Sequence, residues 1–323
     1  MKKTLASAAA ALAIAANLVT AGAGLAAAQE SGAPDATGSS ALVPPLDAHL
    51  NKTGCKLTKE HPNPVILIHG TSDNATAWNK AAPQLAANGA CVYAFDYGQS
   101  DVTVQAAIPG LYGLGDLNES AKQLSAEVDR VLAETGAKKV DLVGHSQGAL
   151  LTKMYIKQMG GAEKVDRVVA IGDTFHGTTL GGADVILRQL IEAFPHLAPF
   201  FASTGATQQV VGTPLIEQIN RLDDTAPGIT YTSIFSPADR TATPNTTSML
   251  QEVEGAHVAN VNMKDVCGVS PQHPDLPKNP TAISLIKWGL DRKDTDTSVP
   301  KEACGDPVNS NGSSDGLDFG SSK

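Results

Sequence analysis

A five-residue segment constrains the fold of this chain more than any other feature. Residues 144–148 have the sequence Gly-His-Ser-Gln-Gly. They follow the strand-like run 140–143, Val-Asp-Leu-Val, and lead into a helical pattern over 147–159. A strand, a sharp turn at a serine and a helix form a nucleophile elbow. The turn strains the serine backbone, and only residues without a Cβ at both ends let strand and helix approach closely. The segment therefore predicts that Ser146 projects from the carboxyl end of a sheet.

Strand and helix patterns alternate along the rest of the chain. Continuous or alternating apolar runs predict strands at 64–69, 90–95, 140–143, 168–171, 229–235 and 257–263. Helical spacing of apolar residues predicts helices at 75–87, 118–135, 147–159, 216–222 and 282–290. This alternation predicts an α/β fold, with a mostly parallel central sheet and helices on both faces. The stretch 178–213 departs from the alternation, although its residues 185–193 are apolar and helical.

The two ends of the chain differ in composition from its centre. Residues 1–28 combine two early lysines, an apolar run and a final Ala-Ala-Ala, which is typical of a secretory signal peptide. The run is too short to span a bilayer, which takes roughly 20 apolar residues. Residues 29–43 and 306–323 are rich in small and polar residues and are expected to be a flexible linker and a flexible tail. We therefore expect a secreted, extracellular protein with a single domain over 44–305.

Charge and composition narrow the class of partner. The net charge is −9 at pH 7, and Lys and Arg form no cluster, which argues against nucleic acid or an anionic membrane surface as a partner. Aromatic residues make up 4% of the chain, so a site that stacks carbohydrate is less attractive than one that holds an acyl chain. We expect a monomer.

The cysteines form an even set. Their spacings do not match a zinc pattern, and in an oxidising compartment four cysteines predict two disulfides. The residues alone leave three pairings open, of which the sequential one would place a crosslink at each end of the domain. The four are Cys55, Cys91, Cys267 and Cys304.

A serine nucleophile needs an imidazole to accept its proton and a carboxylate to orient that imidazole. On an elbow of this kind, the acid follows the serine in the chain and the histidine follows the acid. His273 lies in a loop before the last predicted helix and is the predicted base, whereas His257 starts a strand-like run and is better explained as structural. Asp239 follows the predicted strand 229–235 and is the predicted acid, with Asp173 as the alternative.

The oxyanion formed during acyl transfer needs fixed N–H donors. The amide of the residue after the nucleophile, Gln147, is one. The second donor should come from a loop that follows an early strand, and the amide of Thr71, directly after His69 and Gly70, is the candidate.

Several longer motifs carry a resemblance to a known family. They are Pro-Val-Ile-Leu-Ile-His-Gly-Thr at 64–71, Phe-Asp-Tyr-Gly at 95–98, Gly-Leu-Gly-Asp-Leu at 113–117, the strand and elbow at 140–148, Lys-Met-Tyr-Ile-Lys at 153–157, His-Gly-Thr-Thr-Leu at 176–180 and Pro-Gly-Ile-Thr-Tyr-Thr at 227–232. With these motifs the chain resembles secreted bacterial lipases of the lipase class 2 family, within the α/β-hydrolase superfamily. The resemblance implies hydrolysis of acylglycerol esters by a triacylglycerol lipase with a Ser-Asp-His triad, no cofactor, and the sequential disulfides.

Two places in the sequence leave alternatives open. Arg240 is a basic neighbour of the predicted acid, and pairing would lower the pKa of Asp239; we expect Arg240 to point to solvent instead. The apolar segment 185–201 predicts either a mobile cap, which lines an acyl pocket or opens during transient contact with a lipid interface, or an ordinary helix packed on the core.

Two other functions share the same residues. An acyltransferase would pass the acyl group from the same acyl-enzyme to an alcohol instead of water, and no motif separates it from a hydrolase. A non-catalytic binding protein on the same scaffold would lack a member of the triad, whereas here candidates for all three are present.

Overall fold

The computed structural model describes residues 43–100, 102–194 and 197–305. The predicted signal peptide, the predicted tail and nearly all of the predicted linker lie outside these residues. Within the described ranges, no helix combines the length and the apolar character that crossing a membrane requires.

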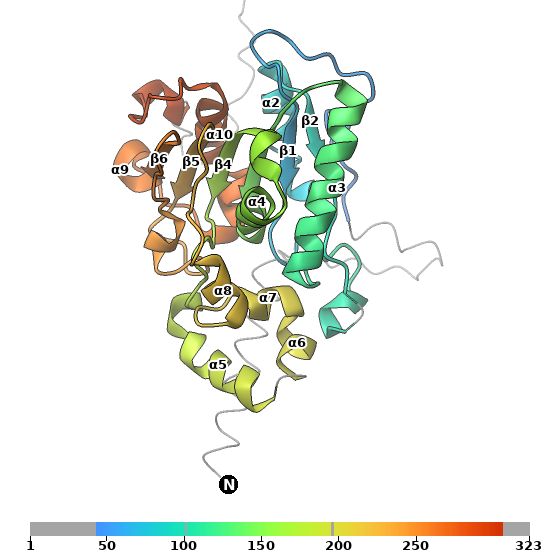
Figure 1. Ribbon diagram of the computed structural model, residues 1–323, viewed down its shortest axis with the longest axis vertical. Coiled ribbons are helices and arrows are strands. Elements are labelled where there is room, and N and C mark those ends of the chain that lie inside the picture. Colours follow the sequence, from blue (N-terminus) through green and yellow to red (C-terminus); the bar gives the residue numbers. More distant parts are fainter. Residues whose placement is uncertain (1–42, 101, 195–196, 306–323) are drawn as a thin grey trace, which may run out of the picture.

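A single six-stranded sheet forms the centre of the molecule, with the strand order β2-β1-β3-β4-β5-β6 (Figure 1). All neighbouring strands pair in parallel, which confirms the predicted α/β class. The strands are β1 (Val65–Ile68), β2 (Val92–Ala94), β3 (Val140–His145), β4 (Val165–Ile171), β5 (Thr230–Phe235) and β6 (His257–Asn262).

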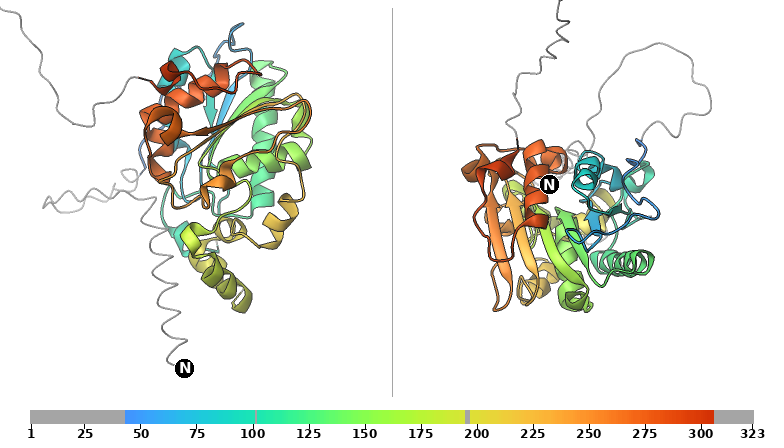
Figure 2. Two further views of the ribbon diagram at one scale, coloured as in Figure 1. Left: turned by 90° about the vertical axis from the view of Figure 1, so that its left-hand side faces the viewer. Right: turned by 90° about the horizontal axis from the view of Figure 1, so that it is seen from above.

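Helices cover both faces of the sheet, as predicted (Figure 2). Successive strand residues point to opposite faces, so Ile66 and Ile68 of β1 join one core and Val65 and Leu67 join the other. The first core includes the apolar sides of α3 (Leu117–Thr135) and α4 (Gln147–Gln158), and the second includes those of α2 (Ala82–Ala87) and α10 (Pro280–Asp291).

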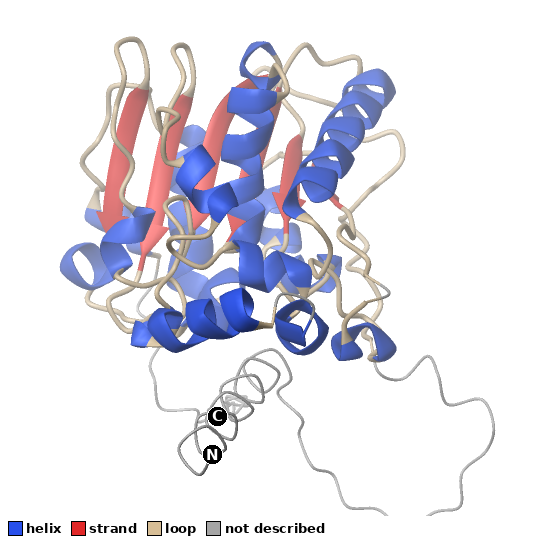
Figure 3. Cartoon of the chain, turned by 60° about the horizontal axis from the view of Figure 1, so that its bottom comes forward, coloured by secondary structure: helices blue, strands red, loops and turns tan. Residues whose placement is uncertain are grey.

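The segment that departs from the alternation forms extra helices between β4 and β5. They are α5 (Asp184–Ala193), α6 (Leu197–Ala202) and α7 (Thr204–Gln208), and the helix predicted at 216–222 follows them as α8 (Pro214–Ile219). Figures 1 and 3 show these helices beyond the carboxyl ends of the strands. Helix α8 packs into the first core through Leu215, Ile216 and Ile219. We call the described residues of 184–208, which form α5 to α7, the cap.

The predicted single helix over 75–87 is wrong. The chain forms the 3-10 helix η2 (Ala75–Trp78), interrupts the helix, and begins again as α2. Asn79 lies in the interruption, where its carboxamide bonds the carbonyl of Pro45 and the amide of Asp47. Pro83, which has no N–H to donate, lies in the first turn of α2 and favours a new helix start there.

Short helices complete the described chain. They are η3 (Val104–Ala107), η4 (Gly161–Glu163), η5 (Leu180–Gly182), η6 (Asn245–Ser248), α9 (Met263–Cys267), η7 (His273–Lys278) and η8 (Lys301–Cys304).

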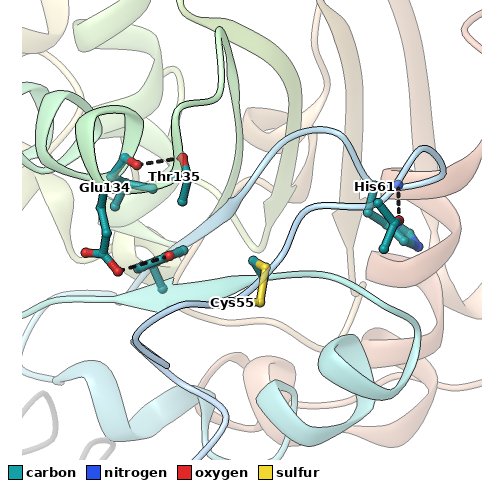
Figure 4. Close-up of a disulfide and its surroundings, with 8 residues drawn as sticks. Cys55, His61, Glu134 and Thr135 are labelled. Carbon is teal, nitrogen blue, oxygen red and sulfur yellow. Dashed lines mark hydrogen bonds between the residues drawn. A yellow bond between two sulfur atoms is a disulfide. The ribbon is translucent and has the colours of Figure 1, made fainter.

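The disulfides join Cys55 to Cys91 and Cys267 to Cys304, which is the sequential pairing. The first fastens the N-terminal segment to the start of β2, near the last turn of α3 (Figure 4). The second fastens η8 to the end of α9.

Candidate active site

Ser146 occupies a strained turn between β3 and α4. Its backbone has φ 53° and ψ −121°, in a region that side chains other than glycine rarely adopt. A Cβ on Gly144 would lie 2.5 Å from the Cα of Ala149, and one on Gly148 would lie 2.3 Å from the carbonyl oxygen of Ile68. Both glycines are therefore required for the close approach of strand and helix, and the predicted elbow geometry is confirmed.

His273 and Asp239 are joined by a hydrogen bond. Nδ1 of His273 lies 2.6 Å from Oδ2 of Asp239, and both side chains are buried. The other oxygen of the carboxylate, Oδ1, accepts from the backbone amides of Thr241 and Ala242 at 2.7 and 2.9 Å. Two adjacent backbone amides of one loop therefore hold the acid and leave one oxygen for the imidazole. The neighbouring Arg240 is exposed to solvent, as predicted.

The alternative acid has different partners. Asp173 is fully buried, and its carboxylate accepts from the hydroxyl of Ser233 at 3.0 Å and from the amide of Phe175 at 3.2 Å. Burial raises the pKa of Asp173 to about 7. Among the described residues, the carboxylate that contacts His273 is that of Asp239.

The alternative histidine lies at the amino end of the strands, whereas the predicted nucleophile lies at their carboxyl end. His257 is the first residue of β6, whereas Ser146 follows the last residue of β3. Because the strands are parallel, the first residue of β6 and the residue after β3 lie at opposite ends of the strands.

A cavity brings three of the predicted residues together. Ser146, His273 and Thr71 line the same space, which has a volume of about 100 Å³. The cap closes one side of it. The lining residues are Gly70, Thr71, Ser72, Asp73, Gln105, His145, Ser146, Thr174, Thr178, Leu180, Leu187, Ala202, Ala206, Gln209, Thr241, His273 and Pro274.

The two predicted oxyanion donors belong to the first residue of α4 and to the loop after β1. Within the part of the chain that the structure describes, neither the amide of Gln147 nor that of Thr71 has a hydrogen-bond acceptor. The side chains of the two residues contact each other, since Nε2 of Gln147 lies 2.9 Å from Oγ1 of Thr71.

Sequence reasoning did not predict the contact between His145 and His273. Nε2 of His145 donates to the carbonyl oxygen of His273 at 3.1 Å, and the centres of the two rings lie 4.7 Å apart. Burial, together with the nearby His273, holds the pKa of His145 well below its usual value. A neutral ring from the elbow therefore supports the loop of the predicted base. The motif contains this histidine, but nothing local indicates its partner, which lies far along the chain.

A second ion cluster, in which Lys153 and Asp224 are buried, lies outside the residues that line the cavity. The carboxylate of Asp224 contacts Nζ of Lys153 at 2.8 Å and Nε2 of His176 at 2.9 Å. Burial alone would raise the pKa of Asp224, but hydrogen bonds from His176 and Lys153 hold this pKa below its usual range. The cluster joins α4 to the loop after β4 and explains two of the sequence motifs, around 153 and 176.

Comparison with known proteins agrees with this architecture. Two curated relatives, a triacylglycerol lipase from Pseudarthrobacter phenanthrenivorans and one from Burkholderia plantarii, are each 34% identical over 121 residues, which is 36% of this chain. That match covers 34% and 30% of their lengths, so the chain spans about a third of the curated relatives it matches.

Solved structures show the same fold. Lipase B from Aspergillus fumigatus aligns with a TM-score of 0.55 at 21% identity, over 72% of this chain and 53% of that one. A lipase from Bacillus licheniformis in its mature form aligns with a TM-score of 0.50 at 16% identity, over 75% of this chain and 95% of that one. The chain therefore has the fold of α/β hydrolases.

A family model described as lipase (class 2) matches residues 62–266, which include all six strands of the sheet. This match covers well over half of the chain. The protein belongs to the lipase class 2 family.

Proposed function

We propose that the protein is a secreted carboxylic ester hydrolase of the triacylglycerol lipase type, which acts through an acyl-enzyme on Ser146. The observation that carries the proposal is the 2.6 Å hydrogen bond between His273 and Asp239, because His273 lines the same cavity as the strained serine. The name of the curated relatives supports acylglycerol esters as substrates.

The proposed reaction uses these groups in sequence. Because Asp239 binds Nδ1 of His273, the proton stays on that nitrogen, and Nε2 is the basic atom that takes the proton of Ser146. The serine oxygen then attacks the ester carbonyl, and the amides of Thr71 and Gln147 donate to the resulting oxyanion. The ester C–O bond breaks, and the alcohol leaves with the proton from His273. Water repeats the sequence on the acyl-enzyme and releases the acid.

An apolar surface near the cavity supports a lipid substrate. Large apolar side chains that are 40–53% exposed gather on the cap and on the neighbouring segment around η3, where Thr103 and Gln105 bond the backbone of α6. They are Val102, Val104, Ile108, Val185, Ile186, Phe194, Leu197, Phe200 and Phe201, and we call them the apolar rim. Patches of this kind mark contact with membranes or proteins. We propose that the rim makes transient contact with a lipid surface.

The test measures turnover of p-nitrophenyl esters by the purified protein and by Ser146→Ala. Loss of the nucleophile should lower kcat by at least about four orders of magnitude. A fluorophosphonate should label the unaltered protein at Ser146 and leave the variant unlabelled. Equal rates in the two proteins would overturn the proposal, and matching circular dichroism spectra would establish that both are folded.

A further inference from the structure

His176 joins two parts of the molecule that are far apart in the chain. Its Nε2 lies 2.9 Å from Oδ1 of Asp224, and its Nδ1 lies 2.8 Å from the carbonyl oxygen of Thr247. Asp224 also contacts Nζ of Lys153 on the elbow helix α4. Thr247 belongs to η6, between β5 and β6, in the segment that carries the proposed acid. Polar contacts therefore run from the elbow helix to the segment of the acid.

Both partners of the His176 ring can only accept a hydrogen bond. A backbone carbonyl has no proton to donate, so Nδ1 must carry a proton toward Thr247. Asp224 is ionised, because its Oδ1 faces the ammonium group of Lys153 and its Oδ2 accepts from the amide of Gln251 at 2.9 Å. Nε2 must therefore carry a proton as well. The two contacts coexist only in the doubly protonated, positively charged form of His176.

The charges around the ring favour this form. Within the described chain, the charged or titratable side chains that face His176 are Asp224, Lys153 from α4 and Asp173 from the end of β4. Burial lowers the pKa of His176, but the hydrogen bond and the charge of Asp224 outweigh burial, and the pKa lies above its usual value of 6.5. The ring therefore loses its second proton only above about pH 6.5.

Loss of that proton removes the contact with Thr247 and keeps the one with Asp224. A hydrogen bond to a carboxylate is stronger than one to a neutral carbonyl, so the remaining proton stays on Nε2. Nδ1 then presents a lone pair to the carbonyl oxygen of Thr247, which lies 2.8 Å away, and the two atoms repel each other. Deprotonation of His176 therefore releases η6 from the ion cluster.

Helix η6 also holds the proposed acid. Nδ2 of Asn245, the first residue of η6, donates to the carbonyl oxygens of Asp239 and Ala242 at 2.9 and 3.1 Å. The amide of Ala242 in turn donates to the carboxylate of Asp239, whose other oxygen binds His273. A shift of η6 therefore moves the carboxylate that orients the proposed base.

We propose that His176 is a positioning residue for Asp239, and that it acts only while both of its ring nitrogens are protonated. The inference rests on the proposed function, because Asp239 affects catalysis only if it orients His273. Thr247 keeps a second contact, in which its hydroxyl donates to the carbonyl oxygen of Gly177 at 2.6 Å, so deprotonation loosens η6 without detaching it. We therefore expect kcat to fall about tenfold as His176 loses its proton.

The first test is the pH dependence of kcat in the unaltered protein. His273 accepts a proton only in its neutral form, so kcat should first rise with pH. Above pH 6.5, deprotonation of His176 should lower kcat about tenfold to a plateau, with KM within twofold of the original because His176 is not among the residues that line the cavity. Hydrolysis of a soluble ester is followed by pH-stat titration between pH 5.5 and 10. A kcat that does not decrease in this range would overturn the inference.

The second test keeps one contact of the ring at a time. The amide nitrogen of asparagine can take the place of Nδ1, and that of glutamine the place of Nε2, and neither titrates. His176→Asn retains a donor toward Thr247 and should keep a high kcat without the decrease above pH 6.5. His176→Gln retains a donor toward Asp224 alone and should have a kcat about tenfold lower at every pH. The opposite order of the two variants, or a decrease that persists in both, would contradict the proposed role.

His49 provides the matched control. Its Nδ1 also faces an aspartate, at 2.7 Å from Oδ1 of Asp47, but the pair is exposed and belongs to the N-terminal segment. His49→Asn should leave the pH profile of kcat unchanged. If this variant also removes the decrease above pH 6.5, the decrease does not report on His176. Thermal unfolding midpoints show whether each variant remains folded.

The protonation state of His176 can also be measured without relying on activity. The ¹⁵N chemical shifts of the ring, assigned by their absence in His176→Asn, should show two protonated nitrogens at pH 6 and a proton on Nε2 alone after the transition above pH 6.5. A ring that is neutral at pH 6 would rule out the proposed switch.

The results for His176 and Ser146 separate this inference from the proposed function. PH profiles that are identical in the unaltered protein and both His176 variants would overturn the inference, while an inactive Ser146→Ala would still support the hydrolase. Activity that survives in Ser146→Ala would overturn both.

Discussion

At the scale of single residues, the partners of a carboxylate decide its role more than its burial does. Asp239 and Asp173 each follow a strand of the sheet, and both are buried. One oxygen of Asp239 is used by backbone amides and the other by His273. The carboxylate of Asp173 is instead bonded to Ser233 and to the amide of Phe175. The proposed acid is therefore Asp239.

Asp239→Asn tests this assignment. The amide group would retain the shape of the carboxylate but would favour the wrong tautomer of His273, and such a change costs about 10⁴ in kcat in serine hydrolases with this triad. Turnover of a soluble p-nitrophenyl ester measures the loss. A decrease of less than tenfold in a folded protein would exclude Asp239 as the orienting group.

Asp173→Asn is the matched control, and its effect should be on stability. Its folded pKa of about 7 lies above the unfolded value of 3.8, so the stability that Asp173 contributes is present below about pH 4 and is lost as the pH rises through 7. At 1.36 kcal/mol per pKa unit, the loss is at most about 4 kcal/mol. The free energy of unfolding in urea should therefore increase for Asp173→Asn, relative to the unaltered protein, as the pH rises from 4 to 8. The kcat of the variant should stay within a few fold of the original. A constant difference across this range would contradict the buried, protonated acid.

At the scale of elements, prediction from the sequence succeeded where an element carries its own local pattern. The apolar runs and the glycines at 144 and 148 indicated the strands and the elbow because their geometry depends on adjacent residues. The helix predicted over 75–87 failed because Asn79 is held by residues of the distant N-terminal segment. The contact of Gln209 with Thr71 could not be predicted for the same reason, since it depends on how the cap packs.

The proposed contact of the apolar rim with a lipid surface can be tested by variants in the cap. Val185 and Leu197 of the apolar rim are 52% and 49% exposed. The double variant Val185→Ser/Leu197→Ser would lose two apolar contacts with a lipid surface, each worth about 1 kcal/mol when partly buried, which corresponds to a rate on a triglyceride emulsion at least about tenfold lower. The rate on a soluble ester should fall much less.

Leu46 provides the comparison for the cap variant. It is 45% exposed and belongs to the N-terminal part of the described chain, and it is not one of the rim residues. Leu46→Ser should leave the ratio of emulsion to soluble rates unchanged. Equal effects of the two variants on this ratio would show that the rim has no special affinity for lipid.

At the scale of the whole molecule, two disulfides of nearly equal span crosslink the ends of the domain. They join residues that are 36 and 37 positions apart. If crosslinks act by restricting the unfolded chain, loops of equal length stabilise equally, here by about 4 kcal/mol each.

Replacing either cysteine pair with serines tests this symmetry. Cys55→Ser/Cys91→Ser and Cys267→Ser/Cys304→Ser should each lower the free energy of unfolding by about 2–5 kcal/mol, measured by urea denaturation. A large difference between the two would show that local packing outweighs chain entropy. The second pair should also lower kcat, because Cys267 lies just before the loop of His273.

The strand order also has a consequence for the timing of synthesis. The proposed nucleophile follows β3, in the middle of the sheet, whereas the proposed acid and base follow β5 and β6, and the last disulfide closes only at Cys304. Domains are made from the N-terminus onward. A nascent chain that ends after β4 would carry the serine but neither partner that activates it. The proposed reactivity would thus arise only after the segment that carries His273 has emerged and folded, and a shorter nascent chain would be inactive toward esters.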